Sequence, residues 1–85
     1  MPKHFYDQFD FIPDWRRRRY HAMVAFMDSK VGEVVDALKA NGMYGDAAIF
    51  FSADNGGPIY GNGAAGANNY PLKGGKATNW EGGVR

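Results

Sequence analysis

The fold is decided by one stretch, AAIFFSADNGG at residues 47–57, in which an apolar run ends in an aspartate, an asparagine and two glycines. A continuous apolar run such as residues 47–52 is typical of a strand that is buried on both faces of a parallel sheet. A buried parallel strand needs a neighbour on each edge, and the rest of the sequence predicts no second strong strand. We therefore expect these residues to form one α/β unit of a sheet whose other strands come from elsewhere.

A long amphipathic helix is predicted upstream of this strand, over about residues 16–41. Apolar side chains recur there at spacings of three and four, so one face of the helix is apolar. Asp14 is placed to act as the N-cap, and Asn41 and Gly42 form a stop because both tolerate the left-handed conformation that ends helices. Residues 1–13 fit neither the helical nor the strand period, and we expect an extended loop whose aromatic side chains dock on something larger.

The composition excludes several kinds of site. There is no cysteine, so disulfides, thiolate metal sites and cysteine nucleophiles are ruled out. Ten Lys and Arg against nine Asp and Glu leave a net charge of +1, which indicates no charged partner. No apolar run approaches the roughly 18 to 20 residues of a membrane span, and the N-terminal residues lack the apolar stretch of a signal peptide.

Asp54 and Asn55 directly follow the predicted strand and are the sharpest candidates for chemistry. Their carboxylate and amide oxygens are ligands of the kind that calcium and magnesium prefer, and ligands of open α/β sheets bind at this end of a strand. Gly56 and Gly57 let the backbone turn close to a ligand. A calcium site needs about six to eight oxygens, so its other ligands must come from other segments. The alternative is an Asx turn that closes the strand.

A second candidate site lies in PLKGGKATNWEGGVR, residues 71–85. Lys73 and Lys76 flank two glycines, so the backbone there can approach an anion closely. A lysine on such a loop presents a point charge to phosphate or sulfate. The alternative is a pair of solvated loop lysines.

Taken together, the two stretches resemble the sulfatase family, particularly its arylsulfatase B-like members. The resemblance is carried by the order FFSADNGG, a variable loop and NNYPLKGGKATNWEGGVR, and it extends from about Phe5 to Arg85. It implies an α/β fold of the alkaline-phosphatase-like type, with one long helix, one buried strand and a long Gly- and Asn-rich active-site loop. Residues 1–85 are then expected to be an internal fragment of a single sulfatase catalytic domain.

The resemblance also implies roles for individual residues. Asp54 and Asn55 match calcium ligands of the family, and Lys76 matches a lysine that contacts the sulfate group of the substrate. The parent enzyme is expected to hydrolyse sulfate monoesters, including those of a sulfated sugar, with calcium and a formylglycine nucleophile. The C/S-x-P-x-R motif that yields formylglycine and the paired aspartates of the calcium site are absent here. We therefore expect the 85 residues alone to be inactive and to bind calcium weakly or not at all.

Further consequences of the resemblance concern the end of the chain and the location of the enzyme. Glu81 and Arg85 belong to a family signature of structural role, and we expect an ion pair between them to fold the turn. A lysosomal or secreted location is implied. The family's histidine upstream of the helix has no secure match in this sequence; His21 lies within the helix and is expected to occupy a surface or hydrogen-bonded position. The long loop supplies five possible pocket residues: Tyr60, Asn62, Asn68, Asn69 and Tyr70.

Arg16 to Arg19 form the strongest local charge feature and support an alternative function. Such a run could make a non-catalytic module that binds a polyanion, either nucleic acid or a sulfated glycan. The simpler interpretation, which we favour, is a solvated helix start, and no nucleic-acid partner is expected. Four positive charges nevertheless oppose the helix dipole at its N-terminus. Another alternative is a related phosphatase or phosphonate hydrolase, since a metal at a strand end serves phosphate equally well.

Overall fold

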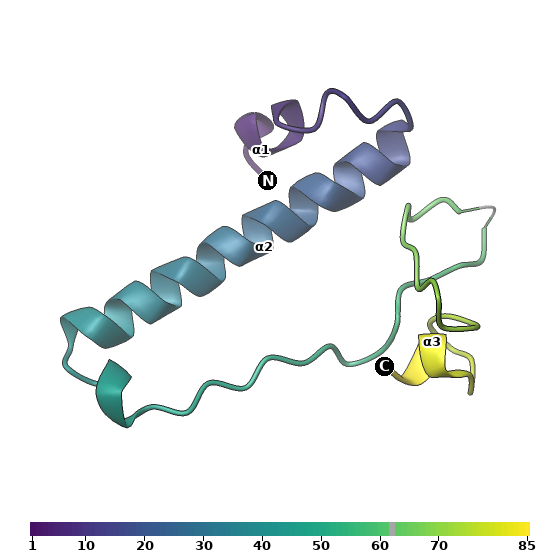
Figure 1. The fold of residues 1–85 in the computed structure, drawn as a ribbon. Helices are drawn as coiled ribbons and strands as arrows, with labels where there is room; N and C mark the ends of the chain where they lie inside the picture. Colours follow the sequence, from purple (N-terminus) through teal and green to yellow (C-terminus); the bar gives the residue numbers. More distant parts are fainter. Residues whose placement is uncertain (62) are drawn as a thin grey trace.

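The structure is a computed structural model that describes residues 1–61 and 63–85. Along the chain the elements are α1 (Lys3–Asp7), α2 (Trp15–Ala40), the 3-10 helix η1 (Tyr44–Asp46) and α3 (Glu81–Val84). The long helix α2 is the axis of the molecule, and α1 lies beside its N-terminal part (Figure 1). After η1 the chain runs back along α2 as an extended segment. It ends in a group of glycine-rich loops followed by α3.

Helix α2 begins and ends where local signals in the sequence predict. The Asp14 side chain accepts hydrogen bonds from the backbone N–H groups of Arg16 and Arg17, at 2.8 and 3.2 Å, and is the N-cap. Asn41 is the C-cap, and Gly42 follows with a φ of +69° in the left-handed region. The observed helix is shifted by one residue from the predicted range.

The prediction of an extended loop over residues 1–13 is wrong for α1. A helix of five residues is not stable by itself, because so few hydrogen bonds cannot offset the nucleation cost. Contacts with α2 stabilise it: the ring of Phe5 packs edge-on against Phe26 with centroids 5.3 Å apart. Phe9, which follows α1, packs against His21 in a tilted arrangement, with centroids 5.6 Å apart. The expected docking of aromatic side chains is therefore met for Phe5 and Phe9, which pack on α2, but not for Phe11, which is 75% exposed.

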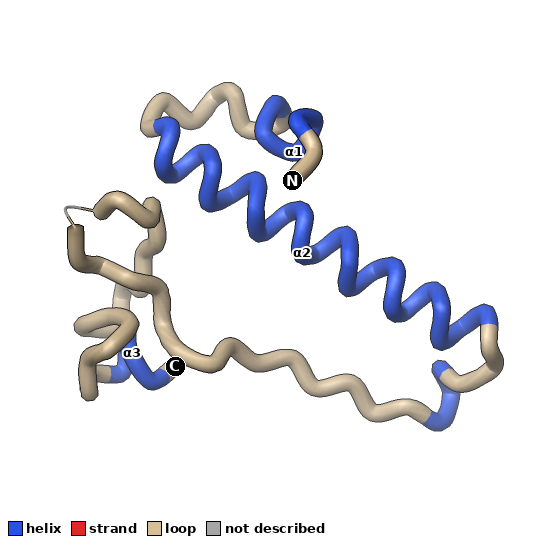
Figure 2. The backbone as a smooth tube through the Cα atoms, turned by 180° about the vertical axis from the view of Figure 1, so that it is seen from behind, coloured by secondary structure: helices blue, strands red, loops and turns tan. Residues whose placement is uncertain are grey.

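The predicted strand over residues 47–52 is not formed within the described part of the chain, which contains helices and loops only (Figure 2). Ala47 has the extended backbone that a strand requires, with φ −93° and ψ 140°. The apolar side chains that follow are exposed, with 92% of Phe50 and 73% of Phe51 accessible. A strand exists only through hydrogen bonds to a neighbouring strand, and no other described segment lies alongside to supply them.

The described residues enclose almost no core. Ala22 is the one buried hydrophobic residue among them. The radius of gyration is 15.9 Å, against about 12 Å expected for a compact domain of this length. One face of α2 carries apolar side chains that remain exposed, which is unusual for a self-contained domain. These side chains are Met23, Val24, Met27, Val31 and Val34.

Candidate functional site

Two glycine-rich loops contact one another in the C-terminal part of the chain. We call residues 54–57 the Asp-Asn loop and residues 73–76 the lysine loop. The backbone N–H of Lys76 donates to the carbonyl of Gly57 at 3.0 Å, and the N–H of Gly56 donates to the carbonyl of Gly83 at 2.8 Å. The two candidate sites of the sequence, about twenty residues apart along the chain, are therefore joined through their backbones.

The close approach of these loops explains the glycines at their centre. A Cβ atom on Gly56 would collide with the backbone carbonyl of Gly82, and a Cβ on Gly82 would collide with that of Gly74. Gly56 and Gly82 are both buried. Only glycine therefore allows the Asp-Asn loop to pack against the start of α3.

The ion pair predicted at the end of the chain is confirmed. Nε of Arg85, the C-cap of α3, lies 2.8 Å from Oε2 of Glu81, the first residue of that helix. Both side chains are exposed, so the pair contributes little, about 0.2–1 kcal/mol. The backbone hydrogen bond from the Gly82 N–H to the Lys73 carbonyl, at 2.8 Å, ties α3 to the lysine loop more directly.

Asp54 and Asn55 present oxygens at the rim of this assembly. Asp54 is exposed and Asn55 is half-buried. Nδ2 of Asn55 donates to the carbonyl of Gly56 at 2.6 Å, which leaves its Oδ1 free of hydrogen bonds to the described residues. This donor set suits a hard cation. No group of three or more His, Cys, Asp or Glu side chains gathers in the described residues.

The two lysines of the lysine loop have different surroundings. Nζ of Lys73 lies 4.0 Å from the ring centroid of Trp80, a cation–π contact that holds this side chain. The side chain of Lys76 is exposed and forms no ion pair with the described residues, while its backbone is fixed to the Asp-Asn loop. Lys76 thus carries a charge that no described aromatic ring engages, on a loop whose backbone is bonded to the Asp-Asn loop.

Asn69 has a structural role that sequence reasoning missed. Its side-chain amide forms three hydrogen bonds: it accepts from the Gly57 N–H at 2.9 Å, and it donates to the carbonyls of Gly57 at 2.7 Å and Gly74 at 3.2 Å. The sequence marked it only as one of several pocket candidates, because nothing local distinguishes it from Asn68. Tyr60, Asn68 and Tyr70 are exposed, and Asn62 lies outside the described residues.

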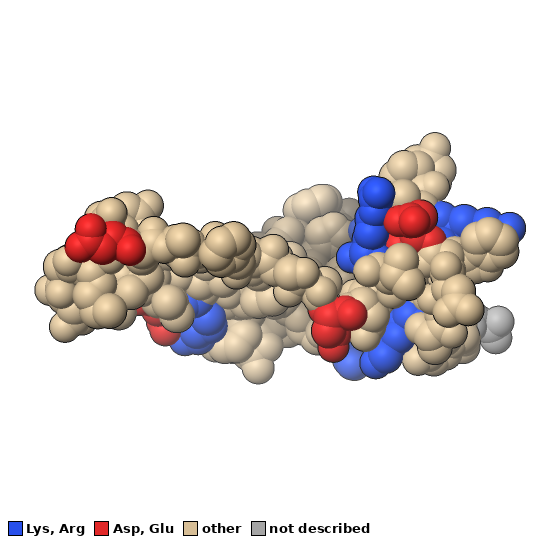
Figure 3. All heavy atoms as spheres, turned by 90° about the horizontal axis from the view of Figure 1, so that it is seen from below, with Lys and Arg blue, Asp and Glu red and all other residues tan. Residues whose placement is uncertain are grey.

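The arginine run is mostly engaged within the molecule. Nη1 of Arg17 donates to the carbonyl of Gly66 at 2.7 Å, and Nε of Arg18 donates to the carbonyl of Tyr6 at 3.0 Å. The Arg18 guanidinium also stacks over the Tyr6 ring, with 3.8 Å between its Cζ and the ring centroid. These contacts hold α1 and the long loop against α2, so the expectation of a simply solvated run is wrong for Arg17 and Arg18. Basic and acidic side chains lie intermixed on the face seen in Figure 3.

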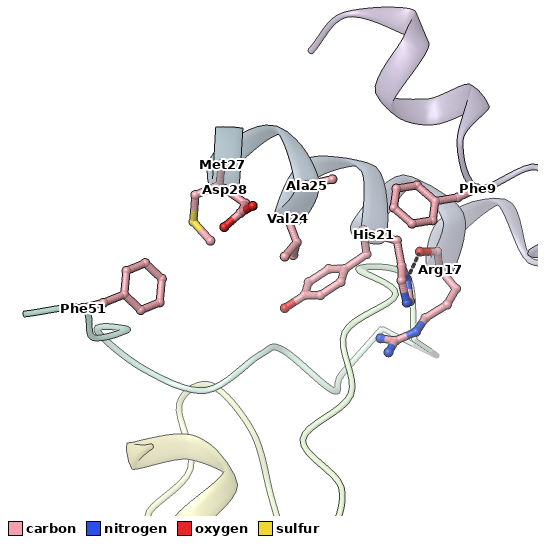
Figure 4. A pocket seen from close by; sticks show the side chains of 9 residues that line it. Phe9, Arg17, His21, Val24, Ala25, Met27, Asp28 and Phe51 are labelled. Atoms are coloured by element: carbon pink, nitrogen blue, oxygen red, sulfur yellow. Dashed lines mark hydrogen bonds between the residues drawn. The ribbon is translucent and has the colours of Figure 1, made fainter. Parts of the chain in front are cut away.

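An apolar groove lies between α2 and the extended segment, away from the two loops. Its volume is about 550 Å³, and Phe51 of the extended segment faces Val24 and Met27 of α2 across it (Figure 4). At its other end Nδ1 of His21 lies 2.9 Å from the carbonyl oxygen of Arg17, so the prediction of a hydrogen-bonded position for His21 is confirmed. The groove carries few polar groups and offers packing surface rather than chemistry.

Comparison with known proteins identifies the family of the chain. The family model for sulfatases matches residues 1–85. The chain therefore belongs to the sulfatase family, and this membership implies an alkaline-phosphatase-like fold. No solved structure matches the chain.

Several sulfatases are similar to this chain over most of its length. Mouse arylsulfatase J is 40% identical over 84 residues, which cover 99% of this chain and 13% of the relative. Pig N-acetylgalactosamine-6-sulfatase is 35% identical over 88% of this chain and 14% of its own length. Human steryl-sulfatase is 34% identical over 89% of this chain and 14% of its own length. The chain thus spans about one seventh of the relatives it matches. Within the described residues, no helix has the length and apolar character needed to cross a membrane.

Proposed function

We propose that these 85 residues are part of the catalytic domain of a sulfuric ester hydrolase, in which they supply two calcium ligands and one sulfate-binding lysine. Asp54 and Asn55 are the proposed ligands, and Lys76 is the proposed contact to sulfate. The observation that carries the proposal is the hydrogen bond from the Lys76 N–H to the Gly57 carbonyl, which joins the lysine loop to the Asp-Asn loop. It keeps the loop that carries Lys76 against the loop that carries the two proposed oxygen ligands.

The donor set fits calcium better than a softer metal. Asp54 offers an exposed carboxylate, and Asn55 offers an amide oxygen, and both are hard ligands. When bound, the ion would polarise the sulfate oxygens and offset negative charge as a Lewis acid. The remaining ligands would come from segments beyond these residues.

Lys76 would bind the sulfate from the other side. Its ammonium is a compact point charge with three donors, so it can follow the sulfate oxygens while negative charge develops on them. The nucleophile, a formylglycine in the resemblance stated above, would also be supplied by another segment. We therefore propose that the isolated chain turns over no substrate. Sulfate monoesters, including those of sulfated sugars, are the proposed substrates, and the lysosomal or secreted location stays a prediction.

The exposed apolar surfaces support the proposal that residues 1–85 belong to one larger α/β domain. Residues 47–52 have the composition of a strand buried on both faces. The extended segment and the apolar face of α2 expose large side chains on both sides of the groove described above. We propose that neighbouring strands of the parent pair with this segment and complete a sheet, which α2 covers on one face.

Two alternatives are less well supported. A polyanion-binding module would need the run Arg16–Arg19 free, yet Arg17 and Arg18 are held by internal hydrogen bonds. A phosphatase or phosphonate hydrolase would use similar loops, but the relatives named above are all sulfatases.

The test is an assay of the full-length protein that contains these residues, with 4-nitrophenyl sulfate and 4-nitrophenyl phosphate as substrates. We expect hydrolysis of the sulfate ester, loss of activity on calcium chelation and recovery when calcium is added back. Preference for the phosphate ester would favour the phosphatase alternative. Absence of hydrolysis of either ester, in protein shown to be folded, would contradict the proposed function.

A further inference from the structure

We propose that Asn69 is a positioning residue that holds the Asp-Asn loop against the lysine loop, an inference that rests on the proposed function. Its side-chain amide bonds to both loops at once. It accepts from the Gly57 N–H and donates to the Gly57 carbonyl, and it also donates to the carbonyl of Gly74. One side chain thereby spans the Asp-Asn loop and the lysine loop.

Gly57 is the junction on which this arrangement depends. Its carbonyl accepts two hydrogen bonds, from Nδ2 of Asn69 at 2.7 Å and from the backbone N–H of Lys76 at 3.0 Å. Its N–H is taken by Oδ1 of Asn69. Asn69 therefore holds both polar groups of Gly57. Gly57 lies three residues after Asp54, which is a metal ligand in the proposed function. A shift of Gly57 would change the separation between Asp54 and the Lys76 side chain.

The chemistry of the contacts requires an amide at position 69. The N–H of Gly57 can only donate, while the two carbonyls can only accept, so the partner needs one acceptor and two donor hydrogens. This also fixes which end of the amide is oxygen. An ionised carboxylate has the same shape but only accepts hydrogen bonds. It would set a negative oxygen against the carbonyls of Gly57 and Gly74.

The adjacent residue, Asn68, provides a matched control for substitutions of Asn69. It is the same residue type, but it is exposed and its Oδ1 accepts only from the Tyr70 N–H at 2.8 Å, a local turn contact. Asn69 is half-buried and bonds across the molecule. The two asparagines therefore separate a local turn effect from a positioning effect.

The experiment compares Asn69→Asp with Asn68→Asp in the full-length protein loaded with calcium. The calcium Kd is measured by titration calorimetry, and KM and kcat with 4-nitrophenyl sulfate. We expect Asn69→Asp at neutral pH to weaken calcium binding by about 10- to 100-fold, as loss of a residue that orients metal ligands does, and to raise KM. Asn68→Asp should leave both values unchanged. A merely structural role would lower Tm but leave the Kd and KM of the folded molecules as they were.

A pH profile gives a second readout that is specific to the hydrogen bonds. When the new carboxyl is protonated it regains an acceptor oxygen and one O–H donor, whereas the amide has two donor hydrogens. The ratio of the calcium Kd of Asn69→Asp to that of the unsubstituted protein should therefore fall, without reaching one, as pH falls through the pKa of the new carboxyl. Asn69→Ala should show no such recovery.

The outcomes separate the inference from the function on which it rests. Equal calcium Kd and KM in Asn69→Asp and unsubstituted protein would overturn the positioning role while leaving the proposed function intact. A loss that is the same at every pH in Asn69→Asp and Asn69→Ala would also overturn it. If the unsubstituted protein binds neither calcium nor the sulfate ester, the proposed function fails and the inference fails with it.

Discussion

At the scale of single residues, the two lysines of the lysine loop allow a sharp comparison. Lys73 is held over Trp80, whereas the Lys76 side chain is exposed and its backbone is bonded to the Asp-Asn loop. We expect Lys76→Ala to raise KM for a sulfate ester by about tenfold or more, because loss of a hydrogen bond to a charged group is equivalent to about 1.5–3 kcal/mol. Steady-state kinetics of the full-length protein measures this. Lys73→Ala is the control; an equal rise in KM there would argue against a special role for Lys76.

A second residue-scale prediction concerns the packing of the loops. Gly56→Ala places a methyl group where the carbonyl of Gly82 lies, so the Asp-Asn loop must move away from α3. We expect a loss of unfolding free energy of about 1–3 kcal/mol in the full-length protein, the usual cost of overpacking. Chemical denaturation measures it. Gly45→Ala is the matched control, because a Cβ there meets no atom within 4 Å. Equal stability of both variants would mean that the two loops do not pack as described.

At the scale of elements, the start of α2 depends on Asp14. The backbone N–H groups of Arg17 and Arg16 donate to its carboxylate and hold the pKa of Asp14 below the ordinary value of an aspartate. Because the folded-state pKa is lowered, the stabilising contribution is complete above the unfolded value and is lost as pH falls through the folded one. We expect helix content, measured by circular dichroism at 222 nm, to fall in this acidic range. Asp14→Asn, which caps without titrating, should show a smaller fall over the same range; an identical acid transition would rule out Asp14 as its source.

What the sequence could predict depends on how local the cause is. The ends of α2 follow from Asp14, Asn41 and Gly42, whose effects act within one turn, so they could be read directly. The five-residue α1 was missed because its stability comes from the packing of Phe5 on α2, which leaves no periodic pattern. The same distinction holds at the site. The residue types of Asp54 and Lys76 suggested their chemistry, whereas the three hydrogen bonds of Asn69 reach across the fold and have no local signature.

At the scale of the whole molecule, the chain is an open structure. Large apolar side chains on both sides of its groove remain exposed, and only Ala22 is buried among the hydrophobic residues described. Covering these surfaces would bury several large side chains, each worth about 1.5–3 kcal/mol. The chain covers 13% of mouse arylsulfatase J, so a relative of that length has many further residues that could cover such surfaces. In the proposed function, the calcium site and the sheet would both be completed by other segments.

This requirement leads to a prediction that compares the two contexts of one residue. Phe50 is 92% exposed here, so Phe50→Ala in the isolated 85-residue chain should leave the helix content measured by circular dichroism unchanged. In the full-length protein, where the proposed sheet buries Phe50, the same substitution should lower the unfolding free energy by about 3–5 kcal/mol, the range for a buried phenylalanine. Denaturant titration of the full-length protein measures the difference. Phe11→Ala, at a position that is 75% exposed and outside the predicted strand, is the control. If Phe50→Ala has as little effect on the full-length protein as on the isolated chain, residues 47–52 are not a buried strand, and the sheet that is proposed to hold the Asp-Asn loop must be placed elsewhere.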